Sequence, residues 1–248
     1  MKLADLSIMY RNIIFPLLLL LLTGLTSAVQ AASRNQQIYN AIQDNDVSLV
    51  EQKLAKGLDP NHRVKGHPIL VHAINANRIE MVKLLLLKKT RFEDYIFRET
   101  IKGNERAVNR LLAAGANLPV IRNKEGETLL MVSAREGHDE IVKTLVLQGA
   151  DANAKSKKGH SAMTYSSRYG HLSIVQYLLN HGAEVNIANN NGWTPLLKAA
   201  RGGHLEVVDY LLAHDANMHS RNSGGLDALA LARRYKHKKV IKYLKDYK

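Results

Sequence analysis

Residues Asn189 to Ser220, NNNGWTPLLKAARGGHLEVVDYLLAHDANMHS, contain the clearest local pattern in the chain. Thr194 is placed to cap a helix, and Pro195 follows at the first helical position, where a missing N–H costs nothing. Gly202 and Gly203 favour an end to this helix near Arg201. A second helix follows, with one apolar stripe formed by Leu205, Val208, Leu211 and Leu212. The stretch predicts a helical hairpin, which cannot bury both apolar faces without similar neighbours.

The same pattern returns every 33 residues. The register is set by four glycines and by four two-residue steps that end in histidine. They are Gly126, Gly159, Gly192 and Gly225, and Gly137-His138, Gly170-His171, Gly203-His204 and Lys236-His237. Repeats of this length stack on one another, so we expect one elongated solenoid in which each unit contacts only its neighbours. No low-complexity segment interrupts the array, and we expect no second domain.

Three repeats read GWTPLLKAARGGH from Gly192, GETLLMVSAREGH from Gly126 and GHSAMTYSSRYGH from Gly159. They resemble the ankyrin-repeat family, whose pattern is G-x-T-P-L-H-x-A-A-x-x-G-H. The resemblance implies an all-α ankyrin-repeat solenoid of about seven stacked helix pairs with β-hairpin-like loops. In the family, the histidine of T-P-L-H supports the hairpin through hydrogen bonds. Its replacement by Met131, Thr164 and Leu197 puts the rigidity of these loops in doubt.

The expected repeat domain spans residues 32–248. Its approximate repeats are 34–61, 62–90, 91–121, 122–154, 155–187, 188–220 and 221–248. The first repeat contains predicted helices at 37–44 and 47–56. The repeat at 91–121 fits the pattern worst, because it lacks T-P-L-H and because Gly103 and Gly137 are 34 residues apart. We expect a deviant hairpin or a local kink there.

Residues 1–31 have the composition of a secretory signal peptide. Lys2 and Arg11 precede an apolar run, and Val29 and Ala31 stand at the −3 and −1 positions of a cleavage site. We therefore expect cleavage after Ala31 and a periplasmic or secreted protein.

The alternative is an inner-membrane anchor formed by residues 13–32, because no charged residue lies between Arg11 and Arg34. The chain has no cysteine. This absence excludes a lipoprotein anchor, disulfides and thiolate chemistry.

Catalytic and metal-binding motifs are missing from the sequence. There is no G-x-S-x-G, no H-E-x-x-H and no glycine loop that leads to Lys-Ser or Lys-Thr. The histidines of the repeated steps would lie about 10 Å apart in stacked repeats, too far to share a zinc ion. We expect them to form hydrogen bonds at turns between helices. The sequence predicts a protein that is not an enzyme and has no cofactor or metal, so its function lies in its surfaces.

The resemblance implies that a partner contacts the hairpin tips and the exposed side of the inner helices, which together form a concave face. An arginine recurs on this side every 33 residues. The residues expected to bind the partner are Arg135, Arg168, Tyr169, Arg201, Arg234, Tyr235, Trp193, His160 and Lys158. Trp193 is either an exposed anchor or a ring that folds over the neighbouring hairpin. The arginines are equally compatible with a solvated face that has no partner, because like charges about 10 Å apart in water repel by only about 0.4 kcal/mol.

Lys and Arg exceed Asp and Glu by 13, which favours an acidic protein partner. Residues 221–248 carry nine Lys or Arg against Asp227 and Asp246. This composition suits a polar terminal repeat or membrane contact through the basic C-terminal helix. We expect no nucleic-acid binding and a monomer when the protein is free.

Exported bacterial ankyrin proteins suggest two roles by resemblance: an immunity protein that neutralises a toxic envelope-targeting enzyme, or a companion that stabilises a periplasmic enzyme. The alternatives are a secreted effector that acts in a host cell and a peripheral membrane-surface protein.

Overall fold

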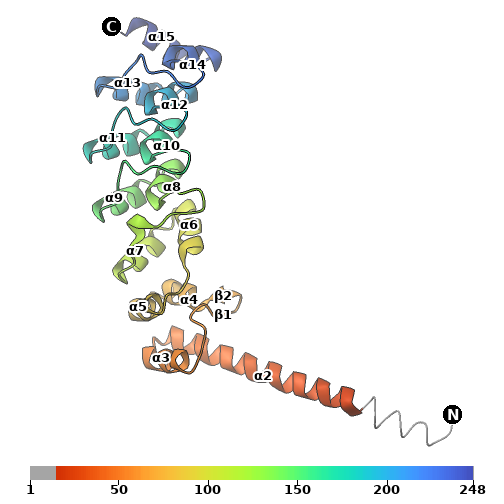
Figure 1. Cartoon of the computed structure of the whole chain (residues 1–248). Helices are drawn as coiled ribbons and strands as arrows, with labels where there is room; N and C mark the ends of the chain where they lie inside the picture. Colours follow the sequence, from red (N-terminus) through yellow and green to blue (C-terminus); the bar gives the residue numbers. More distant parts are fainter. Residues whose placement is uncertain (1–14, 248) are drawn as a thin grey trace, which may run out of the picture. The chain divides into compact units, whose positions relative to one another are not determined.

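The structure is a computed structural model that describes residues 15–247, with only the backbone for residues 15–22 (Figure 1). Seven helix pairs lie within these residues, and two strands of two residues each are the only strands. The predicted all-α solenoid is confirmed. The chain divides into two compact units, of which the first ends at Thr90 and the second begins at Arg91.

The first unit contains two helix pairs and a small hairpin. Its elements are α2 (Phe15–Gln43), α3 (Val47–Ala55), β1 (Arg63–Val64), β2 (His67–Pro68), α4 (Ile69–Asn75) and α5 (Ile79–Leu87). Strands β1 and β2 pair antiparallel, and α2 packs against α3 and α4. Ile38, Ile42 and Ile69 are fully buried in the core of this unit.

The helix that we predicted at 37–44 begins instead at Phe15, so that prediction was wrong at its start. Residues 15–36 are rich in leucine and alanine, which are strong helix formers, and Pro16 lies in the first turn, where proline is tolerated. Helix α2 includes residues on both sides of the predicted cleavage site. The first 14 residues of the predicted signal peptide lie outside the described residues.

Within residues 15–247, no helix has both the length and the hydropathy that are needed to cross a membrane. Residues 13 and 14 of the alternative anchor segment lie outside this range, and cleavage after Ala31 stays a prediction.

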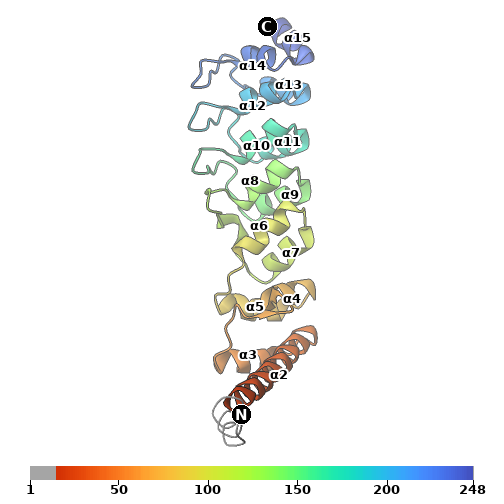
Figure 2. The ribbon, with the colours of Figure 1, turned by 90° about the vertical axis from the view of Figure 1, so that its right-hand side faces the viewer.

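The second unit is a two-layer stack of five helix pairs (Figures 1 and 2). Its inner helices are α6 (Glu93–Ile101), α8 (Leu129–Glu136), α10 (Ala162–Tyr169), α12 (Pro195–Gly202) and α14 (Ala228–Arg234). Its outer helices are α7 (Glu105–Ala113), α9 (Asp139–Leu147), α11 (Leu172–Asn180), α13 (Leu205–Ala213) and α15 (Lys238–Asp246), and a short 3₁₀ helix, η2 (Leu118–Val120), follows α7. Each inner helix packs on the next inner helix, and each outer helix on the next outer helix. The loops that precede α8, α10, α12 and α14 project to one side of the stack (Figure 2).

Helix α12 confirms the local signals in the sequence. The Thr194 hydroxyl accepts a hydrogen bond from the backbone N–H of Leu197 at 3.3 Å, and Pro195 is the first helical residue. Gly203 ends the helix in the left-handed conformation, at φ 79°. Thr128, Ser161 and Asp227 cap the other inner helices of the well-formed repeats in the same way.

The repeated histidines join successive repeats. The Nε2 atom of His171 donates to the Arg135 carbonyl at 3.1 Å, and that of His204 donates to the Arg168 carbonyl at 2.9 Å. His138 and His237 bind the carbonyls of Ile101 and Arg201 in the same way. The expected role of these histidines, hydrogen bonding at the turns, is confirmed.

The irregularity expected at 91–121 falls at the start of that repeat. Helices α6 and α7 form a regular pair, and Asn104 caps α7. Only residues 88–92 connect α5 to α6, whereas residues 148–161 connect α9 to α10. The connection is therefore too short to contain a hairpin loop, and the division between the two units falls within it. The sequence analysis predicted no such division.

Candidate partner-binding face

The side of the second unit formed by α8, α10, α12, α14 and the loops before them is called the inner face here. Arg135, Arg168, Arg201 and Arg234 lie at equivalent places on it, at or next to the C-terminal ends of these helices. The predicted ladder of arginines is therefore present as a set of equivalent positions. Its members differ in their partners.

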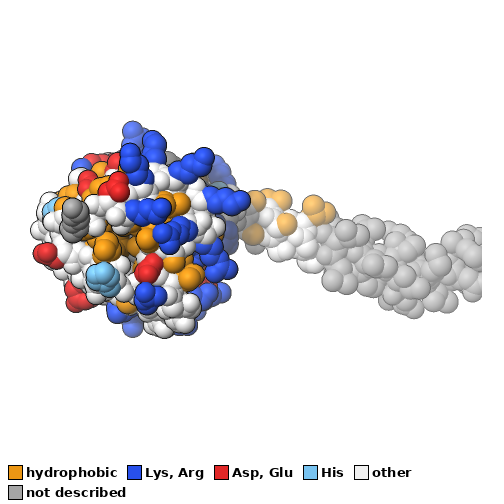
Figure 3. Space-filling model, turned by 90° about the horizontal axis from the view of Figure 1, so that it is seen from above, with side chains coloured by type: hydrophobic (Ala, Val, Ile, Leu, Met, Phe, Trp, Pro, Cys, Tyr) orange, Lys and Arg blue, Asp and Glu red, His pale blue; other side chains and the backbone are white. Residues whose placement is uncertain are grey.

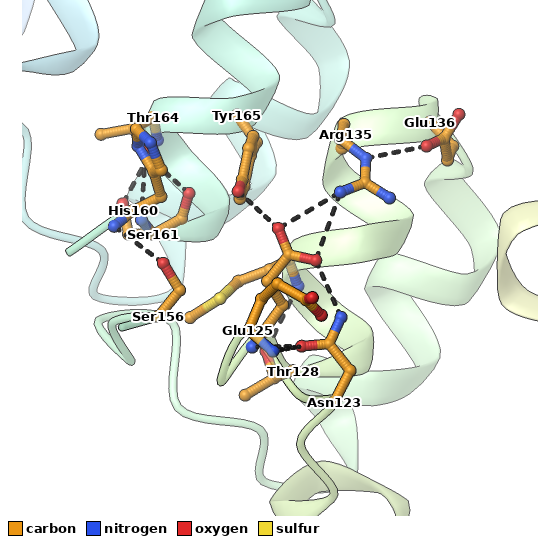
Figure 4. Close-up of polar contacts among 12 residues, drawn as sticks. Asn123, Glu125, Thr128, Arg135, Glu136, Ser156, His160, Ser161, Thr164 and Tyr165 are labelled. Atoms are coloured by element: carbon orange, nitrogen blue, oxygen red, sulfur yellow. Dashed lines mark hydrogen bonds and ion pairs between the residues drawn. The ribbon is translucent and has the colours of Figure 1, made fainter. Parts of the chain in front are cut away.

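Arg135 is held by acidic side chains. Its guanidinium contacts Glu136 at 2.8 Å and Glu127 at 3.2 Å. Glu127 also accepts hydrogen bonds from the Tyr165 hydroxyl at 2.5 Å and from the Asn123 amide at 2.9 Å. In Figure 4 the side chains of Arg135, Asn123 and Tyr165 converge on this carboxylate. Arg135 is thus part of an internal network that joins two repeats.

Glu127 is only 7% exposed, although it directly follows the register glycine Gly126 on the loop before α8. Burial alone would raise its pKa. Hydrogen bonds from Tyr165 and Asn123 and the positive charge of Arg135 outweigh burial, so the pKa of Glu127 is lowered. The carboxylate is therefore ionised near neutral pH and stabilised by its partners. Burial and the neighbouring carboxylate raise the pKa of Tyr165.

The other three arginines pair with no carboxylate among residues 15–247. Arg201 is half-buried, and its Cζ atom lies 5.2 Å from the ring centroid of Trp193 and 5.1 Å from that of Tyr235. Arg168 is exposed and lies 5.3 Å from the ring of Tyr169. Cation–π contact of this kind leaves the positive charge uncompensated.

Trp193 lies against its own helix. Its ring is half-buried, with the Nζ atom of Lys198 4.5 Å from the centroid and Arg201 beside it. It is therefore not a freely exposed tip. Asn189 holds its backbone, because the Asn189 Oδ1 atom accepts a hydrogen bond from the Trp193 N–H at 3.0 Å.

The remaining predicted residues lie around this centre. Tyr169, Tyr235, Arg234 and Lys158 are exposed, and His160 is half-buried. The His160 ring lies 5.1 Å from the Tyr165 ring and 3.2 Å from the Asn189 amide. Burial, together with the positive charges of Lys198 and Arg168, lowers the pKa of His160. Lys158 stays on the loop tip, where no contact joins it to Trp193 or Arg201 in the described part of the chain.

Lys198 is the residue that the sequence analysis missed. It is only 5% exposed. It occupies the position just before the alanine pair of the inner helix, where two other repeats have Val132 and Leu231, both buried. The third equivalent residue is the half-buried Tyr165, so the available signal was a lysine at a position that three other repeats fill with apolar or aromatic side chains.

Residues 15–247 contain no group of three or more His, Asp or Glu side chains that could hold a metal ion. An open pocket lies at the other end of the second unit, between α6 and the loop before α8. It is lined by Asp94, Phe97, Arg98, Ile101, Asn123, Lys124 and Glu125, so it combines both charges and favours neither.

The comparison with protein families agrees with this geometry. A family model described as "Ankyrin repeats (3 copies)" matches residues 96–189 and 181–248, which together exceed half of the chain. The chain belongs to the ankyrin-repeat family.

Proteins of animals are among those similar to this chain. Alpha-latroinsectotoxin-Lt1a of Latrodectus tredecimguttatus is 34% identical over 121 residues, which cover 49% of this chain and 7% of the toxin. "Ankyrin repeat, SAM and basic leucine zipper domain-containing protein 1" of Dasypus novemcinctus is 30% identical, over 51% of this chain and 29% of that protein. Human "Ankyrin repeat domain-containing protein 29" is 38% identical, over 29% and 24% respectively. The chain thus spans less than a third of the length of each of these relatives.

Ankyrin repeats indicate a protein–protein interaction module, and ankyrin proteins are generally non-catalytic. The inner face of this ankyrin domain carries aromatic side chains beside uncompensated arginines. Aromatic residues and arginine are enriched where proteins bind one another.

Proposed function

We propose that the protein is a non-catalytic binding module of the bacterial periplasm and that its inner face binds an acidic protein partner. One observation carries this proposal: Arg168, Arg201, Arg234 and Lys198 pair with no carboxylate among the described residues. An acidic surface that docks on this face would supply the missing negative charges. The net charge of +13 favours such a partner at long range.

Export is supported by the composition of residues 1–31. A periplasmic ankyrin protein of this kind fits two roles: it neutralises a toxic enzyme that targets the envelope, or it stabilises a periplasmic enzyme. The alternative is a secreted effector that acts in a host cell, which would also need an export leader and a partner-binding face. Mass spectrometry of cell fractions checks export, with a mature chain that begins at Ala32 as the expected result. Full-length protein in the membrane fraction would contradict it.

The basic C-terminal repeat is visible at the end of the molecule, where Lys and Arg side chains gather (Figure 3). A membrane-surface role would use the apolar residues of α15. Val240 and Leu244 are, however, fully buried and 5% exposed respectively, because α15 packs on α13 and α14. Val240 and Leu244 are therefore not available to a lipid surface.

A charge-reversal experiment tests the proposed face. The wild-type protein and an Arg168→Glu/Arg201→Glu variant are immobilised and exposed to a periplasmic extract, and the captured proteins are identified by mass spectrometry. The wild type should enrich a protein with an acidic surface that the variant does not enrich. The association rate is then measured with the purified partner. It should be lower for the variant, because the arginines no longer attract the acidic surface. It should also depend less on salt, because salt acts by screening that attraction, over a Debye length of about 8 Å at physiological ionic strength.

The matched control is Lys242→Glu/Lys245→Glu, which makes the same change of charge at two exposed positions of the outer helix α15. It should capture the partner as the wild type does. Equal capture by the folded inner-face variant, at an unchanged association rate in low salt, would show that the binding surface lies elsewhere.

A further inference from the structure

Lys198 has an unusual environment for a lysine. Its side chain projects from α12 at a position that the buried Val132 and Leu231 hold in two other repeats and the half-buried Tyr165 in a third, and Lys198 is 5% exposed. Among residues 15–247, no carboxylate pairs with its ammonium group, and no acceptor is hydrogen-bonded to it. Nζ is not among the fully buried polar atoms that lack a hydrogen-bond partner, so the ammonium group still reaches solvent through this small exposed area.

The groups around Lys198 make the place more positive. Trp193 lies on one side, with its ring centroid 4.5 Å from Nζ. Arg168 and Arg201 are the charges that act on Lys198 most strongly. Glu127, the buried acid of the inner face two repeats away, is already engaged by Arg135, Asn123 and Tyr165. Lys198 and Arg201 therefore flank Trp193, and the charge of Arg168 adds to theirs, while no carboxylate of the described residues pairs with any of the three.

Such an arrangement is costly in the free protein. Burial first, and then the charges of Arg168 and Arg201, lower the pKa of Lys198 to about 8. Burying a charge without a partner is unfavourable, whereas a charge-assisted hydrogen bond to a carboxylate is among the stronger polar contacts in proteins. An anion at this place would offset both the burial and the repulsion.

The geometry points to a carboxylate-binding site formed by Lys198, Arg168, Arg201 and Trp193, which takes one acidic side chain of the protein partner. This inference rests on the proposed function and assigns the central contact of the face. The small exposed area of Lys198 suits a narrow group such as a carboxylate. The Trp193 ring supplies an apolar wall for the methylene groups of a glutamate.

Trp193 is the only tryptophan in the chain, so its fluorescence reports on this site alone. The probe is a short capped peptide of alternating glycine and glutamate, added at constant ionic strength to the full-length protein. The same peptide with glutamine in place of glutamate is the control probe. The glutamate peptide should change the Trp193 emission in a saturable way, and the glutamine peptide should not.

The Lys198→Met variant should bind the glutamate peptide about tenfold or more weakly, because a hydrogen bond to a charged group is lost. Methionine suits an inner-helix position at which Val132 and Leu231 are buried, so we expect this variant to fold. Arg168→Gln, at an exposed position, is a second variant that tests the site if Lys198→Met does not fold. Lys242→Met, on α15, should leave peptide binding unchanged.

Three results would overturn the carboxylate site: an emission change with both peptides or with neither, unchanged binding by folded Lys198→Met and Arg168→Gln, or saturable binding of inorganic phosphate without binding of the glutamate peptide. If one of these results is found while the Arg168→Glu/Arg201→Glu variant still fails to capture the partner, the inner face remains the proposed binding surface and only the carboxylate site is wrong. Capture of the partner by that charge-reversal variant would instead refute the face itself.

Discussion

At the scale of single residues, two buried ionisable groups of the inner face have opposite surroundings. Glu127 has three polar partners, and Lys198 has none among the described residues. Both lie in the same kind of repeat, within one and six residues of the register glycines Gly126 and Gly192. Glu127 joins two repeats to each other, and Lys198 is available to a ligand.

Glu127→Gln should destabilise the second unit by about 1–3 kcal/mol at pH 7, because Arg135 and Tyr165 lose a charged acceptor. Since the pKa of Glu127 is lowered in the folded protein, its contribution is present above the pKa of an unfolded glutamate, about 4, and is lost as the pH falls through the folded value. Denaturant unfolding at pH 7 and at pH 3 measures this. Glu125→Gln, at an exposed position two residues away, should change stability by less than about 0.5 kcal/mol. Equal effects of the two substitutions would show that the contacts of Glu127 do not stabilise the folded protein.

Binding of the glutamate peptide should weaken as the pH rises from 7 to 9. The Lys198 ammonium is charged below its pKa of about 8 and neutral above it, and a carboxylate binds only the charged form well. The loss should approach about tenfold per pH unit at the upper end. Arg168, Arg201 and His160 are the ionisable groups that interact with Lys198 electrostatically, and Tyr165, Arg234 and Tyr235 lie on the neighbouring inner helices or next to their ends.

Two of these groups have shifted pKa values, and neither shift brings a titration into this range. The pKa of His160 is lowered and that of Tyr165 is raised, so both are neutral between pH 7 and 9. The weak binding of Lys198→Met should therefore not vary with pH. Trp193 emission measures both proteins, and a flat profile for the wild type would contradict the role of Lys198.

Single-residue exposure was the least predictable property of the chain. The spacing of Arg135, Arg168, Arg201 and Arg234 was visible in the sequence. Their different partners were not, because they depend on residues that are specific to one repeat, such as Glu127 and Lys198. The position of the Trp193 ring depended on those same neighbours.

At the scale of elements, the glycine that precedes three of the four repeated histidines has two functions. Gly137 has φ 82°, and a Cβ atom built on it would lie 2.6 Å from the His171 ring. Gly149, at the end of the same repeat, has φ 86° but no neighbouring atom within 4 Å. Both positions need the left-handed conformation, and only Gly137 also needs space for the next repeat.

Gly149→Ala should therefore cost about 1 kcal/mol, from backbone strain alone. Gly137→Ala should cost about 1–2 kcal/mol more, because the His171 ring must move and its bond to the Arg135 carbonyl is weakened. Chemical denaturation measures both values. In a His171→Ala background the difference between the two substitutions should disappear, and its persistence would mean that the ring is not its cause.

Helix ends were the most predictable elements. The cap at Thr194, the proline at the first position and the glycine at the end each follow from local chemistry, and α12 shows all three. The start of α2 was not predicted, because leucine-rich residues suit a leader and a helix equally well. The short connection at 88–92 was not predicted either, because the only irregularity visible in the sequence was the 34-residue spacing of Gly103 and Gly137.

At the scale of the whole molecule, the second unit should open unevenly. Helix α12 packs between two inner helices, α10 and α14, whereas α6 has only α8 as an inner neighbour within its unit. In a solenoid, stability depends on such interfaces between neighbours. Hydrogen exchange should thus be slower in α12 and α13 than in α6 and α7. The opposite order would show that the interfaces contribute little here.

The bonds between repeats also bear on how such a chain changes in evolution. Arg122 donates to the Lys155 carbonyl and Lys155 to the Ala188 carbonyl, each across 33 residues, and the histidine bonds span a constant 36 from His171 to His237. A recombination event that duplicates or deletes one full repeat therefore leaves each remaining repeat a matching neighbour. The gene can lengthen or shorten the surface by one arginine at a time, while an insertion of any other length breaks the register.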